Sequence, residues 1–316
     1  MKVGWVYHED FLRHDTGRTH VEQPERLEVI IESLKAEGLL GKMEALSFEA
    51  ADAGVIASIH EPAYIDLVRV FCDEGVMFIG SMETRIGPWS YDVARLAVGG
   101  VIAACDAVMA GRVGRAFCAV RPPGHHAERD QAMGFCLFNN VAIGAEHLIR
   151  KHGLKRVAVV DFDVHHGNGT QHAFETRDDV LYISIHEHPN SLFPGTGLET
   201  ERGVGKGEGF TLNVPLYAGS DDAVYRRAFT DKVLPRLEEY RPEFLLVSAG
   251  FDAVRQERIA HMCLDPESYG WMTADLVRVA DQYCQGRLVS VLEGGYVLDV
   301  LGRSVAIHVA GLMEGK

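Results

Sequence analysis

Short apolar runs alternate with longer amphipathic segments along almost the whole of this chain. Strands that alternate with helices indicate βαβ units, in which helices cover both faces of a mainly parallel sheet. The runs predict strands at Val3–Tyr7, Ala116–Val120, Val157–Val160, Val180–Ile185, Phe244–Ser248 and Leu288–Leu292. The amphipathic segments predict helices at Pro24–Glu37, Tyr91–Ala110, Asn139–His152, Asp222–Tyr240, Pro266–Gln285 and Leu298–Met313. We therefore expect an α/β fold built on one central sheet.

The domain organisation predicted from this pattern is simple. The sequence has no internal repeat, no low-complexity tract and no change of composition typical of a linker. Its longest irregular stretch, Glu187–Glu208, is rich in Gly and Pro and is typical of a surface loop. A chain of 316 residues, 47% of them hydrophobic, can bury a sizeable core without disulfides. One α/β domain over residues 1–316 is the simplest prediction.

The net charge limits the kinds of molecule that the protein could bind, and the cysteines indicate the cellular compartment. The formal net charge of −14 argues against nucleic acid, which needs a basic face, but it leaves open a cationic substrate such as an acylated polyamine or a basic protein tail. No apolar run approaches the roughly 18 residues of a membrane helix, so no membrane partner is expected. Six cysteines without a C-x-x-C pair suit a reducing compartment, and we predict a cytoplasmic location. The oligomeric state stays open.

Four predicted strands run directly into polar motifs. The motifs are RPPGHHAE at residues 121–128, DFDVHHGNG at 161–169, AGFDA at 249–253 and EGGY at 293–296. In open parallel sheets, ligands bind outside the carboxyl ends of the strands. We therefore expect these four motifs to meet in one crevice.

Two of the motifs contain residues that could bind a metal. Asp163 and His165 project to the same side of an extended chain, and Asp252 could supply a third ligand. Charged groups packed this densely after buried strands are costly unless they are paired or bound to a metal. An Asp₂His set leaves a tetrahedral zinc with an open position for water, although iron or manganese would accept similar ligands. The alternative is a set of strand-end caps and core histidines.

The other motifs contain candidates for proton transfer and oxyanion binding. Two prolines and a glycine fix an irregular turn before His125 and His126, which should point in divergent directions. Imidazole can take a proton from water and return it to a leaving amine, with Asp161 and Asn168 available to hold the far ring nitrogens. After two glycines, Tyr296 could aim its hydroxyl at a developing oxyanion. Ordinary turns that happen to contain these residues are the alternative.

Six separated blocks of the sequence together resemble the histone deacetylase and acetylpolyamine amidohydrolase family, in particular its class II-like branch. The blocks are RPPGHHAE, GFCLFNN, VDFDVHHGNGTQ, SIHEHPNSLFPGTG, SAGFDA and LEGGY, and they occur in the order of the family from about Val6 to Ala310. The resemblance implies a single catalytic domain with the arginase-deacetylase fold and about eight strands. It also implies a zinc-dependent hydrolase of linear amide bonds. Arginases share the fold, but their two-metal ligand pattern is absent.

The resemblance also assigns roles residue by residue. It implies that three residues bind zinc: Asp163, His165 and Asp252. It implies that five residues carry out catalysis, with His125 paired to Asp161, His126 facing Asn168, and Tyr296 polarising the scissile carbonyl. Many class I relatives have aspartate where this chain has Asn168, so we expect His126 to be less biased toward its charged form. An apolar tunnel for the acyl-lysine would be lined by Gly134, Phe135 and Phe193, with Glu83 and Ile259 at its rim.

Family members further have two sites for a structural monovalent cation, potassium. An inner site would use the side chains of Asp161 and Ser184 and the carbonyls of Asp163, His165 and Ile185. An outer site would use the carbonyls of Phe174, Arg177, Val180 and Phe210. Arg26 matches an arginine near the internal cavity behind the metal.

The substrate is less narrowly predicted than the reaction. We expect the protein to remove an acyl group from acyl-lysine in proteins or peptides, and acetyl is the acyl group that we favour. The alternatives are a deacetylase of acetylpolyamines or another small acylated amine, and a non-catalytic protein that binds acylated amines. Polyamine-selective relatives carry an acid at the tunnel mouth where this chain has Ile259, although Glu257 lies close in sequence. Three departures from the family remove no catalytic group: Gln23 before Pro24, the segment 256–259, and Glu83 where the family has an aspartate at the rim.

Overall fold

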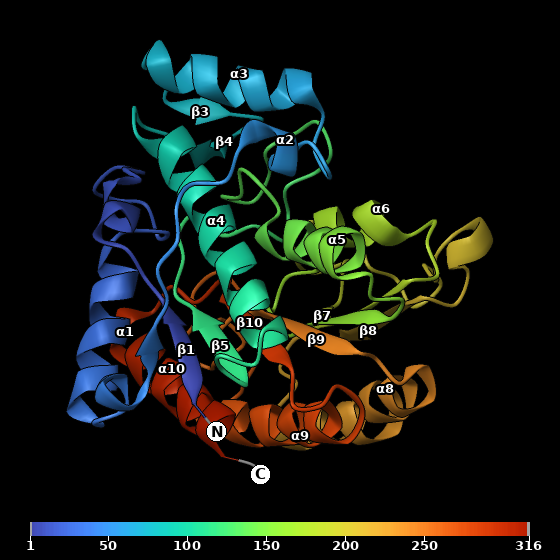
Figure 1. Ribbon diagram of the computed structural model, residues 1–316. Helices are drawn as coiled ribbons and strands as arrows, with labels where there is room; N and C mark the ends of the chain where they lie inside the picture. Colours follow the sequence, from blue (N-terminus) through green and yellow to red (C-terminus); the bar gives the residue numbers. More distant parts are fainter. Residues whose placement is uncertain (1, 315–316) are drawn as a thin grey trace.

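Eight parallel strands form one sheet in the computed structural model, which describes residues 2–314 (Figure 1). In sheet order the strands are β2 (Glu44–Ala45), β1 (Val3–Val6), β5 (Arg115–Cys118), β10 (Leu288–Leu292), β9 (Phe244–Ala249), β6 (Val157–Asp161), β7 (Val180–Glu187) and β8 (Thr211–Leu216). Every neighbouring pair is parallel. The predicted α/β fold with a parallel sheet is confirmed.

Helices cover both faces of this sheet (Figure 1). One layer consists of α1 (Glu25–Ala36), α8 (Leu234–Tyr240), α9 (Ser268–Tyr283) and α10 (Leu298–Met313). The other contains α4 (Ser90–Met109) and α5 (Asn140–His152), with α6 (Asn168–Phe174) beside α5. Because of this double cover, every residue of the six strands β1, β5, β6, β7, β9 and β10 is buried.

Local sequence signals fix both ends of the helix α5. Its first turn is capped by Asn139, whose side chain accepts a hydrogen bond from the backbone N–H of Ala142. It ends at Gly153, which adopts the left-handed conformation with φ of 71°. The chain then enters β6 at Val157, so the end of α5 lies at the amino edge of the sheet.

Several elements were not predicted. The edge strand β8 contains Pro215, which an edge position tolerates, and β2 has only two residues. A separate hairpin of β3 (Phe78–Ile79) and β4 (Ser81–Arg85) lies beside α2 (Ala53–Ile56) and α3 (Pro62–Asp73), which were also missed. Three short 3₁₀ turns complete the structure, at Glu9–Arg13, Leu40–Lys42 and Gly205–Gly207.

The segment predicted as one helix at Asp222–Tyr240 is interrupted. It consists of α7 (Asp222–Ala228), a π-helical turn at Phe229–Val233, and α8. Pro235 follows the wider turn, and its ring removes one of the N–H groups that a regular helix would use. The periodicity alone could not show this irregularity.

The cysteines and the helices can be compared with the predicted reducing compartment and the predicted lack of a membrane partner. All six cysteines are free, and five of them are buried. Across residues 2–314, the structure contains no helix that is both long and apolar enough to span a bilayer. The cellular compartment stays a prediction.

Candidate active site

The four polar motifs meet at the carboxyl edge of the sheet, as expected. The loop after β6 is joined to the loop after β9 by a hydrogen bond of 2.9 Å from the backbone N–H of Val164 to Asp252 Oδ1. It is joined to the loop after β10 by a hydrogen bond of 2.8 Å from the Gly294 N–H to Asp163 Oδ2. The loop after β5 reaches the same place through His125. Segments far apart in sequence therefore form one site.

Asp163, His165 and Asp252, which we call the buried cluster, lie at the bottom of this site. Each offers one ligand atom, and these atoms all lie within 4.8 Å of one another. His165 Nδ1 lies 2.9 Å from Asp163 Oδ1 and 3.3 Å from Asp252 Oδ2. The two carboxyl side chains are completely buried. Sequence reasoning therefore selected three residues that the fold does bring together.

The chemistry of the buried cluster fits a divalent cation. Asp252 Oδ2 is buried and has no hydrogen-bond partner in the described part of the chain. Burial and the neighbouring Asp163 carboxylate raise the pKa of Asp252 to about 6. Such a crowded pair of carboxylates is costly unless a positive charge joins it. A Cβ at Gly294 would lie 2.0 Å from Asp252 Oδ2, so a glycine is needed there to leave room for the carboxylates. Two carboxylates and one imidazole suit zinc, and also iron or manganese.

The two adjacent histidines differ in their partners. His125 Nδ1 lies 3.0 Å from Asp161 Oδ2, whereas His126 Nδ1 lies 2.8 Å from Asn168 Oδ1. Burial opposes a charge on His125, but Asp161 and Asp163 outweigh it and raise its pKa to about 10. Burial and the nearby His125 lower the pKa of His126 well below its usual 6.5. The carboxylates around His125 therefore favour its charged form, whereas the surroundings of His126 favour its neutral form.

Two supporting residues were missed by the sequence reasoning. The Glu293 carboxylate accepts hydrogen bonds from the backbone N–H groups of Gly124 and His125, at 2.7 and 3.1 Å, and from the Ser248 hydroxyl at 3.1 Å. Tyr182 donates its hydroxyl to Asp161 Oδ2 at 3.1 Å. Glu293 had a signal, since it is an acid that directly follows a buried strand; Tyr182 looked like any core aromatic.

A cavity of about 180 Å³ reaches His165 of the buried cluster. It is lined by Glu83, His126, Gly134, Phe135, His165, Phe193, Ile259 and Tyr296. All five residues expected in the tunnel and at its rim are in this set. The Phe193 ring centroid lies 5.0 Å from that of His126, and the Phe135 ring lies 5.6 Å from Tyr296. Gly134 has φ of 53°, and a Cβ there would lie 2.3 Å from the His126 ring.

Two charged side chains, Arg26 and Glu257, contact Tyr296 and its backbone. Arg26 places its guanidinium 4.9 Å from the centre of the tyrosine ring and donates from Nε to the Gly295 carbonyl at 2.7 Å. The Glu257 carboxylate accepts a hydrogen bond of 3.2 Å from the Tyr296 backbone N–H. Glu257 is buried, and Ile259 is the residue of this segment that lines the cavity. The supporting role of Glu257 was not predicted.

Some of the residues expected to bind potassium are neighbours, and two of the expected carbonyl ligands already accept backbone hydrogen bonds. Asp161 and Ser184 are paired neighbours of β6 and β7, and the Ser184 hydroxyl lies 2.7 Å from His186 Nδ1. At the outer site the Phe174 carbonyl accepts from Arg177 N–H at 2.9 Å, and the Phe210 carbonyl accepts from Tyr182 N–H at 3.0 Å. Both potassium sites stay predictions.

Comparison with known proteins places the chain in a family. The family described as Histone deacetylase domain matches residues 20–312. The chain is 42% identical to the histone deacetylase-like amidohydrolase of Pseudomonas aeruginosa, over 93% of this chain and 75% of that protein. It is 38% identical to a probable deacetylase of Archaeoglobus fulgidus, over 95% of this chain and 82% of that protein.

A human relative and a solved structure extend the comparison. The chain is 39% identical to polyamine deacetylase HDAC10 of Homo sapiens, over 99% of this chain and 48% of that protein. The crystal structure of the HDA15 HD domain superposes with a TM-score of 0.93 at 34% identity, covering 99% of this chain and 91% of that one. The chain therefore belongs to the histone deacetylase family.

Proposed function

We propose that this protein is a zinc-dependent deacetylase that removes acetyl groups from acyl-lysine in proteins or peptides, and that its 316 residues form one catalytic domain. The observation that carries the proposal is the cavity itself. It has apolar walls, His165 of the buried cluster on its lining, and beside it both a histidine whose surroundings favour the neutral form and a tyrosine. A site of this kind can hold an amide over a cation while a base acts on water.

Zinc bound by the buried cluster would polarise the amide carbonyl and lower the pKa of water toward about 7. His126 acts as the base in this proposal, because its Nδ1 faces Asn168 Oδ1 and its Nε2 is then free to accept a proton. The same histidine returns the proton to the departing amine, which is a poor leaving group without it. His125, which lies beside Asp161, gives electrostatic support to the negative charge that develops.

Tyr296 supplies a hydrogen bond to the developing oxyanion of the substrate. Burial raises the pKa of this tyrosine well above its usual 10, so its hydroxyl keeps its proton at neutral pH. The hydrogen bond from its backbone N–H to Glu257 and the stacked Arg26 keep the residue in position. A donor that is fixed before the reaction needs no reorganisation when charge appears.

The apolar side chains on the lining of the cavity favour a substrate with an alkyl stem. Phe135 and Phe193 can enclose the four-carbon stem of lysine, and Ile259 places an aliphatic side chain where an acid would attract a second ammonium. Acetylated polyamines are the second candidate substrate, since Glu83 provides one exposed acid on the cavity lining. One relative bears the name polyamine deacetylase.

A side-by-side assay of an acetyl-lysine peptide and acetylspermidine tests the proposal. We expect a higher kcat/KM on the peptide, no turnover after prolonged chelation, and recovery with zinc. Ile259→Glu should shift the preference toward acetylspermidine, whereas Ile259→Leu, which keeps the side chain aliphatic, should not. Full activity of metal-free protein would contradict the mechanism. No turnover of any acylated amine by zinc-loaded protein would favour the non-catalytic alternative.

A further inference from the structure

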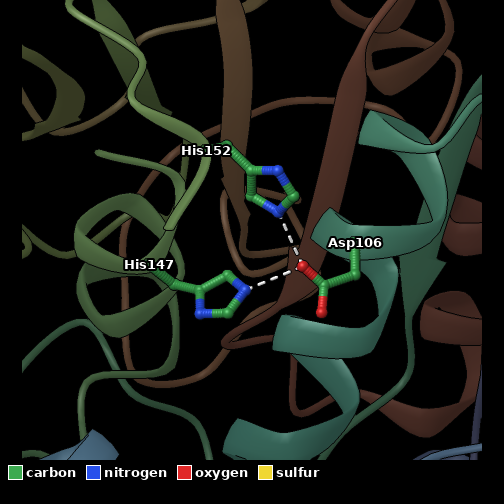
Figure 2. Close-up of side chains that lie close together, drawn as sticks. All are labelled: Asp106, His147 and His152. Atoms are coloured by element: carbon green, nitrogen blue, oxygen red, sulfur yellow. Dashed lines mark hydrogen bonds and ion pairs between the residues drawn. The ribbon is translucent and has the colours of Figure 1, made fainter. Parts of the chain in front are cut away.

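A second group of metal-binding side chains lies at the opposite edge of the sheet. Asp106 is near the end of α4, while His147 and His152 lie in the last turns of α5 (Figure 2). The strands that follow these helices, β5 and β6, begin at Arg115 and Val157 and lead toward the active site at their far ends. We call these three residues the half-exposed cluster, because each side chain is partly open to solvent.

The two imidazoles of the half-exposed cluster converge on one oxygen atom. His147 Nε2 lies 2.8 Å from Asp106 Oδ1, and His152 Nε2 lies 2.7 Å from the same oxygen (Figure 2). All three ligand atoms lie within 4.8 Å of one another. In a tetrahedral zinc site with bonds near 2.0–2.2 Å, ligand atoms are about 3.3 Å apart. Opening the two short contacts by roughly half an ångström would therefore make room for an ion.

The surroundings of the cluster leave its ligand atoms available. Each histidine can move its proton from Nε2 to Nδ1, and in residues 2–314 no protein atom is hydrogen-bonded to either Nδ1. Lys151 contacts the other carboxylate oxygen, Asp106 Oδ2, at 2.8 Å, so it weakens the negative charge without occupying the ligand oxygen. Partial exposure allows water to fill a fourth position.

The type of ligand selects the class of ion. Two imidazoles and one carboxylate suit zinc and its borderline neighbours, whereas calcium and magnesium prefer oxygen ligands. The two helices that supply the ligands pack against each other over the sheet, so an ion here would join their ends. We propose that Asp106, His147 and His152 bind a second zinc ion, independent of the active site, which pins the end of α4 to the end of α5.

Zinc titration of four proteins by calorimetry, with bound zinc counted after equilibrium dialysis, tests this proposal. The proteins are the wild type, Asp252→Ala, the double variant His147→Gln/His152→Gln, and the combination of all three changes. We expect two zinc ions in the wild type, one in each of the next two, and none in the combination. Zinc should also raise the melting temperature of Asp252→Ala, and this rise should disappear in the combination.

Two further variants sharpen the result. Lys151→Met removes a competing ammonium but no ligand, so it should tighten zinc binding in the Asp252→Ala background. His8→Gln changes an exposed histidine outside both clusters and should have no effect. A single His152→Gln change should weaken binding at least about tenfold, since even the loss of an outer partner of a metal ligand costs that much.

The outcomes separate this site from the proposed active-site zinc. If Asp252→Ala binds no zinc, or binds it equally well without His147 and His152, the second site does not exist and the proposed function is untouched. Suppose that the wild type binds one zinc ion, that Asp252→Ala still binds it, and that His147→Gln/His152→Gln does not. Then the second site exists, and the proposal of an active-site zinc is wrong.

Discussion

The buried cluster and the half-exposed cluster use the same kinds of side chain but balance their charges in opposite ways. The buried cluster has two carboxylates for one imidazole, and one carboxylate oxygen has no hydrogen-bond partner within the described residues. The half-exposed cluster has one carboxylate for two imidazoles, and Lys151 contacts its second oxygen. The buried cluster therefore has a carboxylate oxygen that a cation could pair with, whereas both carboxylate oxygens of the half-exposed cluster already have hydrogen-bond partners.

The pKa values of the two aspartates reflect this contrast. Burial and Asp163 raise the pKa of Asp252 to about 6. Burial also acts on Asp106, but hydrogen bonds from Lys151 and the two histidines outweigh it and lower its pKa to about 2. A metal at the buried cluster would therefore relieve repulsion between carboxylates, whereas a metal at the half-exposed cluster would have to replace hydrogen bonds that Asp106 already accepts. We expect the first to control activity and the second to affect only stability.

The largest expected effect comes from removing one aspartate from each cluster in turn. Asp252→Ala should abolish turnover of an acetyl-lysine peptide, because it removes one of the three ligands of the proposed active-site zinc. Asp106→Ala should leave kcat/KM close to that of the wild type, since it lies at the other edge of the sheet. Steady-state kinetics on zinc-loaded proteins measures both. A comparable loss of activity in the two variants would show that the clusters are not independent.

A smaller effect is expected from a change that leaves both clusters intact. Tyr296→Phe removes one hydroxyl that can meet the developing oxyanion, and the loss of one such donor costs roughly 10²–10³ in kcat. Bound zinc should not change. Tyr217→Phe, which alters an exposed tyrosine outside the site, is the matched control. Near-normal kcat in Tyr296→Phe would mean that this residue only shapes the turn.

The smallest effect concerns the stability of the half-exposed cluster without metal. Because the pKa of Asp106 is about 2 in the folded protein and 3.8 ordinarily, its charge stabilises the fold above pH 4 and this contribution is lost as the pH falls toward 2. Asp106→Asn should lower the free energy of unfolding at pH 7 by about 1 kcal/mol, a value reduced for solvent screening of a partly exposed group.

Denaturant unfolding in the presence of a chelator, from pH 7 to pH 3, measures this difference. The gap between Asp106→Asn and the wild type should narrow below pH 4. Asp73→Asn removes an aspartate from an exposed ion pair and should change stability less. A pH-independent gap would mean that the carboxylate acts through packing and not through its charge.

Much of the fold and of the active site could be predicted because the relevant signals are local. Six strands and the motifs that follow them were visible as apolar runs ending in polar residues, and parallel strands place their carboxyl ends at one edge. The missed elements had weak local signals. β2 is only two residues long, and β8 carries a proline that argues against a strand. The π-helical turn before Pro235 had no signal in the apolar pattern.

The sequence by itself determined the α/β fold, the crowding of charged residues after buried strands, and the family motifs that point to hydrolysis. Only the tertiary structure decided that Glu257 contacts the Tyr296 backbone, that Ile259 lines the cavity, and that Asp106 meets two histidines 41 and 46 residues away. The physical reason is that these contacts join side chains from separate elements. Their positions depend on how helices and loops pack over the sheet, and no spacing along the chain encodes that packing directly.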